Sequence, residues 1–121
     1  MRPQLKPNPQ HPIDIKPLGK TVRVTVAGQE VARSHDALLL QEASYAPVVY
    51  IPRKDVRMDL LTRTSHHTYC PYKGEASYFS IPAGGGKAVN AIWTYEEPYE
   101  AVAAIREHLA FYPDRVDTLT Y

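Results

Sequence analysis

The chain has 121 residues, enough for one domain whose core folds without a metal ion or a disulfide. Fourteen basic and thirteen acidic residues give a formal net charge of +1, which excludes the strongly basic surface of a protein that binds nucleic acid mainly through phosphates. The single cysteine excludes an internal disulfide, and there is neither a signal-peptide core nor the roughly 20-residue apolar run of a membrane helix, so we expect a soluble cytoplasmic protein without nucleic-acid or membrane partners.

Residues 1–19 contain five of the eleven prolines and few apolar side chains. They predict an extended N-terminal arm, followed by a single β-rich domain over residues 20–121. The arm has two interpretations. It is a linker without a structural role, or Ile13, Ile15 and Leu18 pin it across the domain or onto a second copy of the chain. The second interpretation allows a homo-oligomer and makes the protein a scaffold or interaction module.

The first half of the domain has strand patterns. In "TVRVTV" valines alternate with polar residues, and a glycine-bearing turn leads into a return strand, so residues 21–33 predict a β-hairpin. The segment "ALLLQEA" that follows is compatible with a helix or a strand. Residues 48–51 are β-branched or aromatic and stop at Pro52, which predicts a further strand.

The second half alternates turns and strands. "RKDVRMDLL" predicts a turn or a short helix capped by Asp55. "TYCPYKG" predicts a turn with Pro71 at its second position and Gly74 at its fourth. "ASYFSI" and "AVNAIWTY" predict two strands joined by a glycine-rich hairpin loop, with Trp93 as an anchor of the core.

One helix is predicted near the C-terminus. Pro98 suits its first turn, and Val102, Ile105 and Leu109 recur at spacings of three and four residues. Pro113 ends the pattern. The whole order predicts an α+β, mainly β fold in which one small antiparallel sheet carries one C-terminal helix packed on it.

Two motifs resemble cofactor-binding sites, but each lacks residues that such a site requires. "AGGGKAV" has Ile81 and Ala88 where a phosphate-binding loop needs Gly and Ser or Thr, so it predicts a hairpin turn. His66, His67 and Cys70 lie close together, but the other histidines form no second cluster to complete a zinc site. We therefore expect neither a metal nor another cofactor.

Two further segments leave alternatives open. Cys70 is either a small apolar residue of the core or a nucleophile whose thiolate His67, Lys73 or an arginine stabilises. "PRKDVRMD" is either a self-paired charged surface or a place where Arg53 or Arg57 holds an anionic ligand in a forked contact.

Four ordered motifs, "YIPRKDVRMDLL", "HHTYCPYKGEASYF", "NAIWTYEEPYEA" and "LAFYPDRVD", resemble the bacterial and fungal family known as domain of unknown function number 427, sometimes labelled a nucleotidyltransferase domain. The likeness covers residues 21–117. It implies a compact β-rich domain similar to the tent-like sheets of zinc-binding relatives, without their paired cysteines, and it implies no established reaction. The glycine-serine loop and carboxylate pair of nucleotidyl transfer are not visible. The matching motif positions are Tyr50, Pro52, Arg53, Asp55, His67, Tyr69, Cys70, Pro71, Lys73, Gly74, Trp93 and Tyr95.

The leading hypothesis is a domain that binds a small anionic or polar ligand in one basic and aromatic pocket. The expected ligand-binding residues are Arg53, Asp55, Arg57, Tyr69, Lys73, Tyr78 and Trp93. The alternative is an enzyme in which Cys70 or His67 does covalent or acid–base work. Strand alternation in "TYC" places Cys70 and Tyr69 on opposite faces, so the two are not expected to share a pocket.

Overall fold

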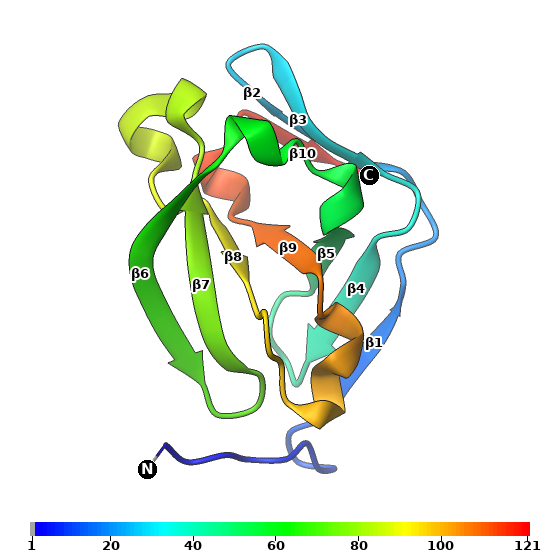
Figure 1. Cartoon of the computed structure of the whole chain (residues 1–121). Helices are drawn as coiled ribbons and strands as arrows, with labels where there is room; N and C mark the ends of the chain where they lie inside the picture. The colour runs from blue at the N-terminus through cyan, green and yellow to red at the C-terminus, as the bar shows by residue number, and fades with distance from the viewer. Residues whose placement is uncertain (1) are drawn as a thin grey trace.

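The computed structural model describes residues 2–121 and contains two antiparallel β-sheets stacked as in a sandwich (Figure 1). The larger sheet has the order β1-β4-β5-β9-β8-β7-β6, and the smaller one the order β10-β2-β3. The strands of the larger sheet are β1 (Ile13–Pro17), β4 (Leu38–Glu42), β5 (Val48–Pro52), β9 (His108–Phe111), β8 (Ile92–Thr94), β7 (Gly74–Ser80) and β6 (Thr62–Cys70). Those of the smaller sheet are β10 (Thr118–Thr120), β2 (Val22–Val26) and β3 (Gln29–Ser34).

All helices in the described residues are short 3-10 helices. They are η1 (Arg53–Asp55), η2 (Met58–Leu60), η3 (Pro82–Ala88), η4 (Glu100–Ile105) and η5 (Pro113–Arg115). None of them has the length and apolar character needed to cross a membrane. The prediction of a mainly β, antiparallel domain is therefore confirmed.

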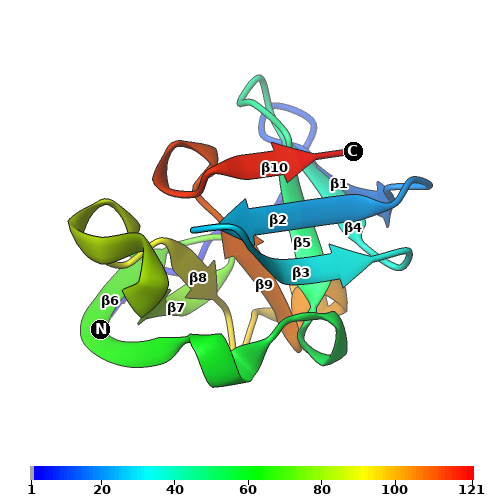
Figure 2. The ribbon, with the colours of Figure 1, turned by 90° about the horizontal axis from the view of Figure 1, so that it is seen from above.

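The central strands of the larger sheet are buried on both faces, and their side chains alternate between two cores. On one face, residues such as Val49, Ile51 and Leu109 pack against the valines of the smaller sheet and form the first core. Figure 2 shows the smaller sheet lying across this face. The other face carries a second core that is rich in tyrosine and is bordered by η4. Its buried members are Leu40, Tyr50, Ala76, Tyr78, Tyr95, Val102, Ile105 and Ala110.

The larger sheet curls until its two ends approach each other. Glu42 ends β4, next to the β1 edge, whereas Lys73 lies in the turn between β6 and β7 at the opposite end of the strand order. The two side chains nevertheless form an ion pair. The concave side of the curl therefore faces the second core.

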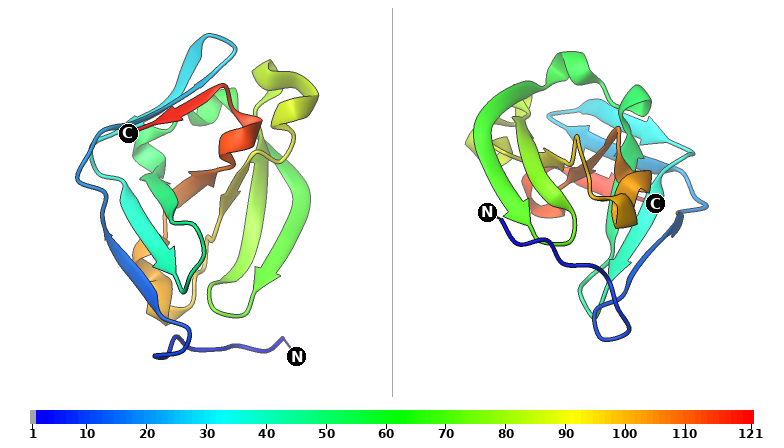
Figure 3. Two further views of the ribbon diagram at one scale, coloured as in Figure 1. Left: turned by 180° about the vertical axis from the view of Figure 1, so that it is seen from behind. Right: turned by 60° about the horizontal axis from the view of Figure 1, so that its bottom comes forward.

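The N-terminal arm crosses between the same two ends, as the right-hand view of Figure 3 shows. Leu5 donates its backbone N–H to the carbonyl of Pro71 in the β6–β7 turn, with N and O 2.9 Å apart. Further along, β1 pairs with β4 from Ile13 to Pro17. The last part of the predicted arm thus forms the edge of the larger sheet.

Several sequence predictions are confirmed locally. Residues 21–33 form the β2–β3 hairpin, and residues 48–51 lie in β5. "ALLLQEA" forms a strand, because β4 pairs on both sides, with β1 and with β5. The turn at Pro71 leads into Gly74, whose φ of +112° favours glycine.

The predicted C-terminal helix is wrong. Residues 100–105 form only a 3-10 helix, Glu107 has a φ of +61°, and the chain then enters β9. Val102 and Ile105 pack into the second core and Leu109 into the first, so their spacing does not describe one helix face. Pairing of β9 with both β5 and β8 decides the conformation.

The predicted cap at Asp55 is wrong as well. The helix η1 has no side-chain cap at its start, and Asp55 instead accepts a hydrogen bond from the hydroxyl of Ser34 in β3, with the two oxygens 2.6 Å apart. Asp55 therefore bonds to a residue of the smaller sheet and does not cap the helix in which it lies.

Replacing Glu107 by glycine tests the chain path at the start of β9. A non-glycine residue at φ +61° carries backbone strain, so Glu107→Gly should leave the free energy of unfolding unchanged or raise it by up to about 1 kcal/mol. Glu107→Ala keeps the strain and should gain nothing. Urea denaturation measures both. A loss of about 1 kcal/mol in the glycine variant alone would indicate a true α-helix here.

Candidate functional site

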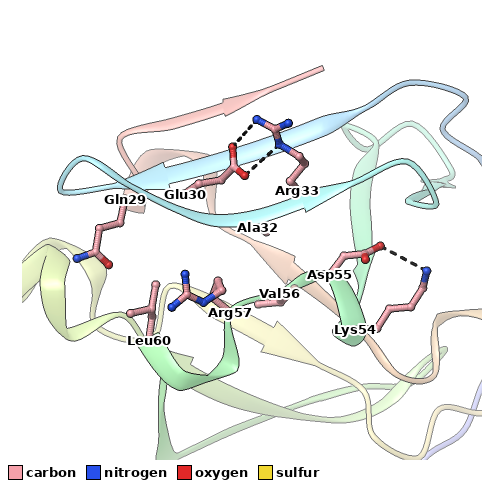
Figure 4. A pocket seen from close by; sticks show the side chains of 9 residues that line it. All are labelled: Gln29, Glu30, Ala32, Arg33, Lys54, Asp55, Val56, Arg57 and Leu60. Carbon is pink, nitrogen blue, oxygen red and sulfur yellow. Dashed lines mark hydrogen bonds and ion pairs between the residues drawn. The ribbon is translucent and has the colours of Figure 1, made fainter.

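Two hollows each contain more than one of the ligand-binding residues expected from the sequence. The first lies between β3 and the segment that includes η1 and η2 (Figure 4), and has a volume of about 660 Å³. Its lining residues are Gln29, Glu30, Ala32, Arg33, Lys54, Asp55, Val56, Arg57 and Leu60. We call it the β3 cleft.

The charges of the β3 cleft are already paired. The ion pairs are Glu30 with Arg33, Lys54 with Asp36, and Arg57 with Asp59. Arg57 uses its fork fully, because Nε and Nη2 donate to the two carboxylate oxygens of Asp59 at 3.0 and 2.8 Å. Asp55 is held by Ser34. An anionic ligand here would have to compete with every one of these pairs.

The second hollow lies in the concave side of the larger sheet, within the second core, and has a volume of about 270 Å³. Five tyrosines and the single tryptophan line it. The full lining is Leu40, Glu42, Tyr45, Ala46, Val48, Tyr50, Lys73, Tyr78, Trp93, Tyr95 and Tyr112. We call it the tyrosine pocket.

Hydrogen bonds fix part of the aromatic wall. The Trp93 indole N–H donates to the Tyr50 hydroxyl, with N and O 3.3 Å apart. The Tyr78 hydroxyl lies 3.0 Å from Thr68 Oγ1 and 3.5 Å from the Tyr112 hydroxyl. The rings of Trp93 and Tyr112 are also in contact, with centroids 4.5 Å apart. These bonds hold the rings in one arrangement around the hollow.

Burial sets the protonation of the tyrosines. It raises the pKa of Tyr50 and of Tyr95 well above the ordinary value of 10.0. Burial, together with the hydrogen bond to Tyr78, raises the pKa of Tyr112 to about 12. At neutral pH these hydroxyls are protonated and can donate hydrogen bonds into the pocket.

The charged end of the pocket is the pair of Lys73 and Glu42. Lys73 is 7% exposed, and its ammonium group donates to Glu42 and lies 3.8 Å from the sulfur of Cys70. His11, from the arm, lies 2.7 Å from the other Glu42 oxygen. Burial opposes ionisation of Glu42, but the hydrogen bonds from Lys73 and His11 outweigh it and leave the pKa of this carboxyl below its ordinary value of 4.5.

The structure divides the expected ligand-binding residues. Lys73, Tyr78 and Trp93 meet in the tyrosine pocket. Arg53 lies with its guanidinium carbon 5.9 Å from the centroid of the Phe79 ring, whose side chain belongs to the first core. Asp55 and Arg57 line the β3 cleft. The expectation that these residues surround one pocket is therefore wrong, because they lie on different faces of the larger sheet.

Strand β6 separates the other candidates. Cys70 packs against the second core, on the opposite face of the strand from Tyr69, and this separation is what the alternation in "TYC" predicts. Tyr69 is on the opposite face, where its hydroxyl bonds to Tyr99 and to the carbonyl of Pro3. His67 shares the face of Tyr69 and lies exposed, 3.6 Å from Glu75. Cys70 and His67 therefore cannot act together in one site.

Sequence reasoning missed half of the pocket. Glu42 and Tyr45 come from segments that carry no motif, and Tyr112 stands in the motif "LAFYPDRVD" but was not among the expected ligand-binding residues. His66 was considered only as a metal ligand, but it shares a strand face with Thr68 and Cys70, and its ring lies against that of Tyr78, with centroids 4.5 Å apart. The one feature of the sequence that pointed to an aromatic pocket was the high tyrosine content, but it does not show which tyrosines come together.

Comparison with known protein families gives a match over most of the chain. The family described as "Domain of unknown function (DUF427)" matches residues 14–121. A search of the curated proteins finds no match.

Removing the carboxylate of Glu42 should destabilise the fold. Glu42→Gln leaves the Lys73 ammonium buried without a counter-ion, so the free energy of unfolding should fall by about 3 kcal/mol at pH 7. Because the folded-state pKa of Glu42 is below 4.5, this contribution is present above that pH and is lost as the pH falls through the folded value. Urea denaturation from pH 3 to 7 should therefore show a difference between wild type and variant that shrinks in acid.

Two variants control this measurement. Asp59→Asn breaks an exposed ion pair and should change stability little. Adding Lys73→Met to Glu42→Gln removes the unpaired charge and should restore part of the loss. Wild-type stability of Glu42→Gln at pH 7 would contradict the role of the pair.

Proposed function

The chain belongs to the DUF427 family, and we propose that it binds a small polar ligand with a flat ring in the tyrosine pocket. The observation that carries the proposal is the convergence of aromatic rings from several strands on one hollow. Tyr50 comes from β5, Tyr78 from β7 and Trp93 from β8. Ligand sites of proteins are mostly apolar and aromatic, with a few fixed polar groups that orient the ligand.

The size and charge of the pocket narrow the ligand. A volume of about 270 Å³ lies just below the usual range of ligand sites, which starts at roughly 300 Å³, and so suits a small ligand. Lys73 is already neutralised by Glu42, so the pocket offers no free cation to an anionic ligand. Of the anionic and polar ligands expected from the sequence, the geometry favours the polar kind.

The pocket contains the only tryptophan of the chain, which makes binding easy to follow. Benzyl alcohol, a flat ring with one polar group, should shift the single indole N–H signal in NMR spectra. Ala46→Leu enlarges an exposed side chain at the pocket lining and should weaken this binding about fivefold or more. Ala83→Leu makes the same change at an exposed position of η3 and should have no effect.

The outcome locates the binding site. Equal binding by wild type and Ala46→Leu would place the probe outside the tyrosine pocket. If no ring compound shifts the indole signal at millimolar concentration, the proposed function is wrong.

A second candidate function is an enzyme with Cys70 as nucleophile. The distance of 3.8 Å between its sulfur and the Lys73 ammonium favours this candidate, because a neighbouring cation stabilises the reactive thiolate. The alternative nucleophile or base, His67, lies on the other face of the sheet and does not support Cys70.

Alkylation measures this reactivity. If Cys70 is a nucleophile, iodoacetamide should label it faster than it labels glutathione at pH 7, with Cys70→Ser as the unlabelled control. A rate equal to or below that of glutathione would contradict the enzymatic candidate and leave the binding proposal unaffected.

A further inference from the structure

Two hydroxyl protons of the tyrosine pocket have no acceptor. The Tyr50 oxygen accepts the Trp93 indole N–H and leaves its own proton unused. The Tyr95 hydroxyl has no hydrogen-bond partner in the part of the chain that the structure describes. Tyr50 is 1% exposed and Tyr95 is 7% exposed, so bulk water is largely kept from both.

Both tyrosines line the hollow. No side-chain polar atom in residues 2–121 is both sealed from solvent and without a bond, so the Tyr95 hydroxyl keeps some contact with open volume. An unmet donor in a buried place costs free energy, and native folds keep one mainly where another group meets it. A ligand oxygen in the hollow could accept both protons.

The local charges favour a neutral oxygen over a carboxylate. Burial is the main reason that the pKa of Tyr50 and of Tyr95 is raised, and the negative charge of Glu42 adds to the rise in both. The field of Glu42 therefore reaches both hydroxyls. A carboxylate bound there would meet the same repulsion, whereas a neutral carbonyl would not.

We propose that the ligand is a neutral carbonyl compound on a flat ring, whose carbonyl oxygen accepts hydrogen bonds from Tyr50 and Tyr95. Its ring lies against the aromatic wall of Trp93 and Tyr112. This inference rests on the proposed function, since it names the chemical class of ligand for the same pocket.

Three probes of similar size separate the features of such a ligand. Benzamide has a neutral carbonyl, benzoate has a carboxylate, and protonated benzylamine has no acceptor. Titrations followed by the indole N–H signal of Trp93 should show that benzamide binds about tenfold more tightly than benzylamine. Benzamide should also bind more tightly than benzoate.

Tyr95→Phe removes one donor and keeps the ring. This variant should bind benzamide roughly three- to tenfold more weakly, because one hydrogen bond is lost, and should bind benzylamine as wild type does. Tyr121→Phe removes an exposed hydroxyl outside the pocket and should leave all three affinities unchanged. Should Tyr95→Phe fail to fold, the order of the three probes on the wild-type chain decides.

The outcomes distinguish the two proposals. Equal affinity for the three probes, wild-type benzamide binding by Tyr95→Phe, or tighter binding of benzoate than of benzamide would overturn the neutral carbonyl and leave the pocket as a binding site. If none of the three probes and no other ring compound shifts the indole signal, both proposals are wrong.

Discussion

The buried ion pair between Lys73 and Glu42 is the contact on which the shape of the larger sheet depends. It joins the β6–β7 turn to β4, which lie near opposite ends of the strand order. Desolvation of the two charges offsets much of their attraction, so we regard the pair as a device that fixes geometry more than as a source of stability. A sheet that curls in this way encloses a volume on its concave side, and a flat sheet would leave the same tyrosines on an open surface.

The two faces of the larger sheet contribute to two different cores, because adjacent residues of one strand point to opposite sides. In β5, Val49 and Ile51 enter the first core and Tyr50, between them, enters the second. The first core is filled mostly by aliphatic side chains of both sheets. The second combines aliphatic side chains with rings that have polar tips, and these rings line the hollow. The stable face and the candidate binding face are thus built on the same strands.

The sequence alone predicts much of the local structure. Alternating valines, the turn residues at Pro71 and Gly74, and β-branched runs identify strands and hairpins, because these patterns depend on neighbours within a few positions. It fails at residues 100–109, where the apolar spacing suits a helix. There, the backbone of β9 finds hydrogen-bond partners in β5 and β8, and this pairing outweighs the local preference.

For the candidate site, the sequence by itself determined the materials: nine tyrosines, one tryptophan, a lone cysteine, and the separation of Cys70 from Tyr69 by strand alternation. Only the tertiary structure decided which of them meet. It sent Arg53 to the opposite face from Lys73, although both stand in motifs of the same family, and it brought Glu42 to the pocket from a segment without a motif. The reason is that side-chain direction follows from local alternation, whereas strand order and sheet curvature arise from pairings between residues far apart in the chain.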